Sequence, residues 1–287
     1  MARTAIITRT KDRPVFLRRA LKSVANQTHT DYIHIVVNDG GSKQTVDDMV
    51  SELEEEQRAK TKVFHREISS GAPDTIFNES IDRTDSEYFV IHDDDDTWHS
   101  EFLEYTVAHL DNHTDIGAVV VRTDKVIESV ADDRLIRKKK YQWMPDVKVI
   151  NLYRQCIDNQ FTPIATLFRR DAYRNVGKFD DTLPVIGDWE FGIRLLMKYD
   201  ADYIDPGFAL ANYHHRIGAD NSFATHNHHY YVNKVMNKYL RQELAEGCLG
   251  VGYIMSELKY NQNWVSSIVK RALPNFVVRR LKQRIND

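Results

Sequence analysis

Residues 87–98 read EYFVIHDDDDTW, so a short apolar run leads directly into four consecutive aspartates. The run 87–91 is rich in aromatic and β-branched residues, which is typical of a buried strand. Four adjacent carboxylates repel one another unless water or a cation neutralises them. Ligands of open α/β sheets bind beyond the carboxyl ends of strands, so residues 93–96 predict a site for a cation or a phosphate-bound metal at this edge.

Strand-like and helix-like segments alternate around this run. Short apolar runs predict strands, and the amphipathic or charged segments between them predict helices. Such alternation is typical of a doubly wound α/β fold with a mainly parallel sheet. We expect strands at 4–8, 33–37, 62–65, 87–91 and 117–121, with helices starting at Pro14 and covering about 44–60, 72–82 and 101–112.

The second half of the chain is less regular. Residues 125–150 are polar and basic and predict a solvated loop or hairpin, with a loop that faces phosphate or acceptor as the alternative. We expect a main domain at 1–221 and a helical region at 222–287 that ends in a basic, amphipathic tail. Further elements are expected at 161–168 (buried), 171–176 and 188–199 (helices) and 202–205 (strand).

Bulk properties indicate a globular enzyme. The chain has 287 residues and a net charge of −3, so nothing in the total points to nucleic acid. Cys156 and Cys248 form neither a disulfide framework nor a zinc spacing, and no apolar run is long enough for a membrane span. We expect a cytoplasmic protein without a signal peptide. The basic tail either packs on the main domain or makes peripheral contact with the inner face of a membrane.

A further carboxylate follows another predicted strand. Asp39 comes after the run 33–37 and precedes Gly40, Gly41 and Ser42. A carboxylate there can accept hydrogen bonds from a nucleobase or a ribose, although Asp-Gly after a strand is also a common turn. Neighbouring parallel strands would bring Asp39 and the acidic run to the same edge of the sheet.

The acidic run suits Mg²⁺ or Mn²⁺. Hard divalent cations take oxygen ligands, and Mg²⁺ usually binds one or two carboxylates together with substrate phosphates. On an extended chain Asp93 and Asp95 would point the same way, so one could meet a ribose and the other the metal. The metal would neutralise a leaving diphosphate.

An ordered set of motifs across residues 4–221 resembles the family 2 glycosyltransferases of the GT-A fold. Each motif alone is weak, but their order is specific; they lie at 6–14, 20–28, 36–42, 92–98, 176–184, 187–191 and 213–216. The resemblance implies a GT-A (Rossmann-like), mainly parallel sheet flanked by helices. It also implies an inverting, metal-dependent enzyme that transfers a sugar from a nucleotide donor, expected to be a UDP-sugar, to the hydroxyl of a glycan or lipid-linked acceptor. Such an enzyme would serve bacterial surface polysaccharide or glycoconjugate synthesis.

The resemblance also implies a role for each matching residue. Asp188 matches the catalytic base. The nucleotide-binding positions are Thr8, Arg9, Thr10, Arg13, Asp39, Asp93 and Asp94. The metal-binding positions are Asp95, Asp96 and His214, with His215 as the alternative histidine; His215 and Arg216 match diphosphate contacts. The walls for the sugar or acceptor are Trp98, Trp189 and Glu190.

Two positions depart from the family pattern. The loop 8–13 is longer than in many members, and residue 187 is glycine where members commonly have glutamate, so the base rests on Asp188 alone. Without the resemblance, Asp188 reads as a helix N-cap, and Trp98 and Trp189 read as core residues.

Two other functions remain open from the sequence. A sugar-phosphate nucleotidyltransferase would use similar acids but usually has a glycine-rich loop after the first strand, and residues 8–13 contain no glycine. A non-catalytic, Ca²⁺-dependent sugar-binding module would explain the acidic run but neither Asp39 nor Asp188.

Overall fold

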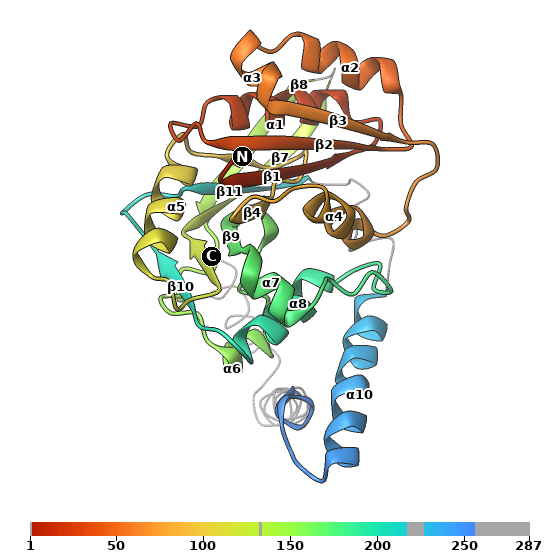
Figure 1. Cartoon of the computed structure of the whole chain (residues 1–287), viewed down its shortest axis with the longest axis vertical. Coiled ribbons are helices and arrows are strands. Elements are labelled where there is room, and N and C mark those ends of the chain that lie inside the picture. Colours follow the sequence, from red (N-terminus) through yellow and green to blue (C-terminus); the bar gives the residue numbers. More distant parts are fainter. Residues whose placement is uncertain (1, 132–133, 217–226, 256–287) are drawn as a thin grey trace, which may run out of the picture. The chain divides into compact units, whose positions relative to one another are not determined.

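The computed structural model describes residues 2–131, 134–216 and 227–255 (Figure 1). The chain divides into two compact units, Met1–Tyr231 and Val232–Asp287. The basic tail expected after residue 264 lies outside the described residues. No helix in the described part of the chain is both long and apolar enough to span a bilayer.

The main sheet has seven strands in the order β10-β6-β9-β4-β1-β2-β3. Only β9 breaks the parallel arrangement, because it runs antiparallel to both β4 and β6. This confirms the predicted mixed α/β class with a mostly parallel sheet. The strands are β1 (Thr4–Thr10), β2 (Tyr32–Asp39), β3 (Thr61–Arg66), β4 (Tyr88–Ile91), β6 (Ala118–Val121), β9 (Thr166–Arg169) and β10 (Ala201–Ile204).

The helices occupy the segments between these strands, largely as expected. The one clear difference lies at 44–60, where two helices replace the single one predicted. Three glutamates fall at the start of the second, α3, where the helix dipole favours negative charge. The helices are α1 (Pro14–Ala25), α2 (Lys43–Ser51), α3 (Glu55–Lys60), α4 (Pro73–Asp82), α5 (Phe102–Asn112), α6 (Leu152–Gln155), α7 (Arg170–Val176) and α8 (Gly187–Leu196).

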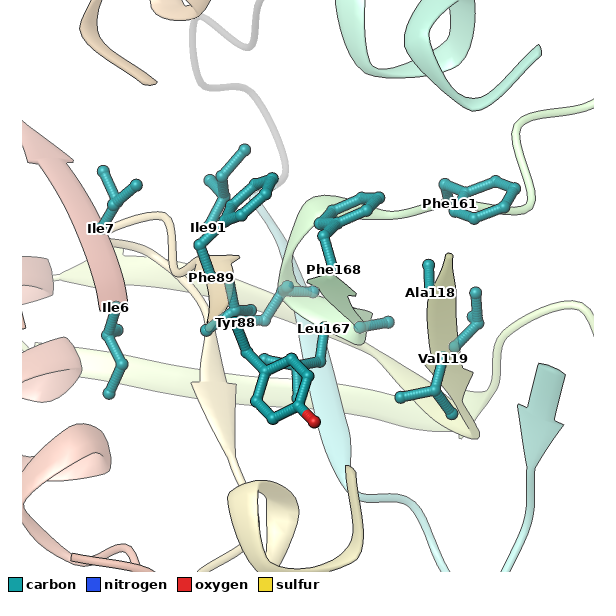
Figure 2. Packing of buried hydrophobic residues seen from close by; sticks show 14 of the residues in the cluster. Ile6, Ile7, Tyr88, Phe89, Ile91, Ala118, Val119, Phe161, Leu167 and Phe168 are labelled. Atoms are coloured by element: carbon teal, nitrogen blue, oxygen red, sulfur yellow. The ribbon is translucent and has the colours of Figure 1, made fainter. Parts of the chain in front are cut away.

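Buried side chains of β1, β4, β6 and β9 pack together in the main core cluster (Figure 2). Phe89 of β4 and Phe168 of β9 stack with ring centroids 5.2 Å apart, and Tyr173 of α7 meets Phe89 edge-on. Burying one such ring contributes about 2–3 kcal/mol relative to leaving it in water. This packing fixes the strand from which the acidic run emerges.

A second, four-stranded sheet has the order β5-β11-β7-β8. Its strands are β5 (Thr97–Trp98), β11 (Ala211–Arg216), β7 (Thr123–Ala131) and β8 (Arg134–Gln142). β7 and β8 form an antiparallel hairpin, so the hairpin interpretation of residues 125–150 is confirmed. β5 directly follows the acidic run and pairs with β11, which brings the histidines of β11 next to the aspartates.

The described residues of the second unit are mostly helical. They include most of α10 (His228–Glu246) and a shorter helical segment at 251–255. Glu243 accepts hydrogen bonds from the backbone N–H groups of Gly252 (2.6 Å) and Tyr253 (3.1 Å). One carboxylate of α10 therefore holds the start of the segment that follows.

Candidate active site

The acidic run forms a tight turn beyond β4. The backbone N–H of Asp96 donates to the carbonyl oxygen of Asp93 (3.1 Å), so the run is not the extended segment expected from the sequence. Exposure still alternates, with Asp94 and Asp96 buried and with Asp93 and Asp95 partly exposed. The turn therefore presents Asp93 and Asp95 and buries the two acids beside them.

The two buried acids are bound by the protein itself. Asp94 accepts a hydrogen bond from the Thr10 hydroxyl (2.8 Å) and pairs with the Arg13 guanidinium (2.7 Å). Asp96 accepts the backbone N–H of His214 (2.7 Å). Burial raises the pKa of Asp94 to about 7 and raises that of Asp96 well above its usual value. These acids hold the turn between β1 and β11.

Asp95 lies between two arginines. Its Oδ2 atom is 2.6 Å from Nη2 of Arg13 and 2.7 Å from Nη1 of Arg216. Burial opposes ionisation, but the two guanidinium charges outweigh it and lower the pKa of Asp95. Both guanidinium groups lie over the ring of Phe16, at 4.8 and 4.4 Å from its centroid. Asp95 is therefore an ionised carboxylate held between the guanidinium groups of Arg13 and Arg216.

His214 lies behind the acidic turn. Its Nδ1 is 2.9 Å from Glu128 and its Nε2 is 2.9 Å from the Thr97 hydroxyl. Glu128 also pairs with Arg19 (2.8 Å), and despite its burial these hydrogen bonds from His214 and Arg19 lower the pKa of Glu128 to about 2. Both ring nitrogens thus have protein partners, and the backbone N–H of His214 binds Asp96; metal binding by the His214 ring stays a prediction.

Glu128 and Arg19 were missed by the sequence analysis. Glu128 lies two residues after the buried Val126 on β7, so both side chains face the same way, and opposite it the pairing shifts by one residue at Lys138 of β8. The basic region around it predicted solvent exposure, whereas Glu128 is buried. Nothing local in the sequence signals an inward carboxylate there.

Asp39 ends β2 and holds the loop that follows β3. It accepts hydrogen bonds from the backbone N–H of Ser70 (2.7 Å) and the hydroxyls of Ser69 (2.9 Å) and Ser70 (3.2 Å). Gly40 has φ +84°, and a Cβ there would lie 2.9 Å from the Ser69 nitrogen. The glycine thus permits the close approach of the two loops, and Asp39 lies at the same sheet edge as the acidic turn.

Asp188 lies in the first turn of α8. The N-cap of this helix is Ile186, so the N-cap interpretation of Asp188 is wrong. Asn159 donates from Nδ2 to Oδ2 of Asp188 (2.7 Å). Burial raises the pKa of Asp188 to about 6, and the charge of Asp93 contributes in the same direction. The structure therefore brings a partly exposed carboxyl group with a raised pKa near the acidic turn.

Asp74 is a second acid at this position, and the sequence analysis missed it. It lies at the start of α4, only 4% exposed, and burial together with the charge of Asp188 raises its pKa to about 8. A Cβ on Gly187 would lie 1.6 Å from Oδ2 of Asp74. The space that a side chain at 187 would fill, where family members commonly carry glutamate, is therefore occupied by the carboxyl group of Asp74.

Replacing Gly187 with alanine should destabilise the protein. The added methyl group must displace Asp74 or the start of α8, and such overpacking costs about 1–3 kcal/mol. Chemical denaturation of Gly187→Ala against the wild type measures the loss. In the double variant Asp74→Ala/Gly187→Ala the collision is absent, so it should be more stable than Gly187→Ala. An equally unstable double variant would contradict this account.

The two tryptophans expected as walls for the sugar are core residues. Trp98 is 7% exposed, donates from Nε1 to the carbonyl oxygen of Ile164 (2.6 Å) and stacks on Phe102. Trp189 is 6% exposed and donates to the carbonyl oxygen of Gln155 (2.6 Å). A buried ring with a satisfied N–H cannot form a wall, so this expectation is wrong.

Glu190 and Thr8 are also fully buried inside the protein. Glu190 is fully buried and forms an ion pair with Arg194 (2.8 Å). Thr8 is fully buried because β1 continues to Thr10, and its hydroxyl lies 2.9 Å from Nε2 of His34. These positions correct two expectations. Glu190 does not line a wall for the sugar or acceptor, and Thr8 does not face a nucleotide.

Arg9 and His215 lie at the rim of the same region. Burial raises the pKa values of Asp74 and Asp93, and the charge of Arg9 lowers both, so Arg9 is close enough to act on both acids electrostatically. His215 is partly exposed, and burial followed by the charges of Lys125 and Arg216 lowers its pKa. These side chains add positive charge or neutral donors around the acidic turn.

The residues of the acidic turn are suited to bind a divalent cation together with the phosphates of a substrate. Within the described ranges, Asp95, Asp96 and His214 do not form a closed cluster of three ligands. Mg²⁺ and Mn²⁺ do not require one, because they are often held by one or two carboxylates plus substrate phosphates. The ionised, partly exposed Asp95 meets that need.

Solved structures of two proteins resemble this chain. The structure of S. aureus TarS 1–349 in complex with UDP-GlcNAc has a TM-score of 0.64 at 20% identity, over 82% of this chain and 64% of that one. The mannosyltransferase PcManGT from Pyrobaculum calidifontis, in complex with GDP-Man and Mn²⁺, has a TM-score of 0.63 at 13% identity. The match covers 99% of this chain and 79% of that one. The chain thus spans somewhat less than two thirds of the TarS structure. These likenesses show a GT-A fold.

The sequence comparisons agree with the fold. A relative from Mycobacterium tuberculosis (strain H37Ra), named PGL/p-HBAD biosynthesis glycosyltransferase, is 22% identical over 191 residues, which cover 66% of this chain and 68% of the relative. The model of the family described as Glycosyl transferase family 2 matches residues 5–177, more than half of the chain. The protein therefore belongs to glycosyl transferase family 2 and is a transferase enzyme.

Proposed function

We propose that this enzyme transfers a sugar from a nucleotide donor to an acceptor hydroxyl in one inverting displacement, with Asp188 as the base. The observation that carries the proposal is the partly exposed Asp188 carboxyl group, oriented by Asn159 and close enough to the acidic turn for the charge of Asp93 to act on it. An acceptor hydroxyl needs a positioned base to take its proton as attack develops. A direct displacement needs no second carboxylate as a nucleophile.

The leaving diphosphate would meet the opposite part of the site. Asp95 and Asp93 would share a Mg²⁺ or Mn²⁺ ion with the donor, and the bound ion would neutralise charge on the diphosphate. Arg216 and Arg9 supply fixed positive charge around these acids. Preorganised charge of this kind stabilises a leaving group without reorganisation during the reaction.

Asp39 supports a uridine donor. TarS was solved with UDP-GlcNAc and the archaeal mannosyltransferase with GDP-Man, so the shared fold accommodates either base. In this chain Asp39 fixes the Ser69–Ser70 loop, and its carboxylate can accept further hydrogen bonds from a base. We infer a UDP-sugar donor from Asp39.

A ligand screen tests the donor. With Mn²⁺ present, UDP should raise the melting temperature more than GDP at equal concentration, because ligand binding to the native state stabilises it. Asp39→Asn should reduce the UDP shift, whereas Asp47→Asn, an exposed acid on α2, should not. A larger shift with GDP would contradict the uridine assignment.

The acceptor is inferred to be a glycan or a lipid-linked saccharide. The mycobacterial relatives are named for PGL/p-HBAD biosynthesis, which is consistent with glycoconjugate synthesis. A lipid-linked acceptor would place the enzyme at the cytoplasmic face of a membrane, in contact through the basic tail. The nucleotidyltransferase alternative predicts pyrophosphate release from a nucleoside triphosphate, and product analysis separates the two reactions.

A further inference from the structure

We propose that His109, His113 and Asp202 form a second metal site, which binds a borderline divalent cation such as Zn²⁺. One nitrogen from each histidine and one oxygen of Asp202 all lie within 4.8 Å of one another. Asp202 lies on β10, the edge strand that β6 and β9 separate from β4. The site is therefore distinct from the acidic turn.

The backbone brings the two histidines together. His109 lies in the last turn of α5 and His113 directly follows the helix, so the two side chains are one turn apart. Their rings stack with centroids 4.1 Å apart and an interplanar angle of 20°. Across the gap, Nε2 of His109 lies 2.7 Å from Oδ2 of Asp202. Three donors thus converge from a helix and a strand far apart in sequence.

The hydrogen bonds of His113 prepare it for a metal. Its Nδ1 lies 2.9 Å from the carbonyl oxygen of His109, and a carbonyl only accepts, so Nδ1 carries the proton. The lone pair of the neutral ring is then on Nε2. Histidines that bind metals usually donate their other N–H to a carbonyl or carboxylate in this way. Binding would replace the proton between His109 and Asp202 with the cation.

The donor set selects a different metal from the one at the acidic turn. Two imidazoles and one carboxylate suit Zn²⁺, whereas Mg²⁺ prefers oxygen ligands alone. A groove of about 660 Å³ is lined by both histidines of the cluster and by Glu101, Glu104 and Asp205. It leaves room for a water or further ligand at a fourth position and provides negative charge around the cation.

The proposed ion would join α5 to the edge of the main sheet. β10 pairs with β6 on one side and has no strand on its other side within the described residues. A metal shared by His109, His113 and Asp202 would fasten this strand to the helix. Cations that bind only the native state raise its stability.

Calorimetric titration of the full chain with Zn²⁺ tests the site. We expect one Zn²⁺ per chain in the wild type and a rise in melting temperature. His113→Gln should bind Zn²⁺ at least tenfold more weakly, with no change in its melting temperature in EDTA because His113 is exposed. Asp202→Asn should show the same loss. UDP binding with Mn²⁺ should not change in either variant.

Matched controls separate this site from other Zn²⁺ binding. His65→Gln breaks another histidine–aspartate pair, His65 with Asp47 (3.0 Å), which is not part of a three-ligand cluster, so it should retain the Zn²⁺ site. Unchanged Zn²⁺ affinity in His113→Gln would overturn the proposal. So would a loss of Zn²⁺ binding in Asp95→Asn alone, because the metal would then lie at the acidic turn.

Discussion

Asp188→Asn should lower kcat for sugar transfer by about 10²–10⁴-fold, the range that a positioned general base contributes. The amide keeps the size of the side chain but cannot take the acceptor proton. Donor affinity should change little, because the proposed role of Asp188 is to take the acceptor proton rather than to hold the donor. Steady-state transfer assays together with UDP titration by calorimetry separate the two effects.

The pH profile gives this prediction a second readout. The base acts in its ionised form, and burial raises the pKa of Asp188 to about 6. Transfer by the wild type should therefore fall about tenfold for each pH unit below that value and level off above it. The residual activity of Asp188→Asn should lack this dependence.

Asp181→Asn provides the matched control. Asp181 is an exposed acid in the loop before α8, so its amide variant tests the loss of one charge without touching the site. It should retain wild-type kcat and the same pH profile. Near-normal transfer by Asp188→Asn, or an equal loss in Asp181→Asn, would remove Asp188 from the role of base.

The first five predicted strands of the main sheet were readable from sequence for a physical reason. Strands such as β4 and β6 are buried on both faces, so they appear as continuous apolar runs. The second sheet gave no such signal. β11 has the sequence ANYHHR, and it is a strand because it pairs with β5 and β7, which lie about a hundred residues earlier.

Local sequence patterns also could not predict which amphipathic side chains are buried. Trp98 and Trp189 are compatible with either a core position or a sugar-binding wall. Their indole N–H groups donate to carbonyl groups 66 and 34 residues away, and these contacts place both rings in the core. Asp74 illustrates the opposite case. Glycine at 187 was recognised as a departure from the family, but only the structure shows that a carboxyl group from α4 fills the vacated space.

Asp95→Asn should abolish most of the metal dependence of donor binding. Asp95 is the acid of the turn whose pKa is lowered, so it is the carboxylate best able to bind a cation. The amide removes that charge, and we expect Mn²⁺ to enhance UDP affinity at least about tenfold less than in the wild type. UDP titrations with Mn²⁺ and with EDTA measure the enhancement for each variant.

The arginines around Asp95 sharpen this test. Without the carboxylate, Arg13 and Arg216 no longer share a counter-charge at Oδ2, so their guanidinium groups can pair with a diphosphate. UDP affinity in EDTA should therefore stay constant or increase while the Mn²⁺ effect disappears. Asp94→Asn is the control: Asp94 faces Thr10 and Arg13 inside the protein, so its amide variant should lose stability and keep the Mn²⁺ response. The reverse pattern, with the Mn²⁺ response lost in Asp94→Asn and kept in Asp95→Asn, would assign the metal to Asp94.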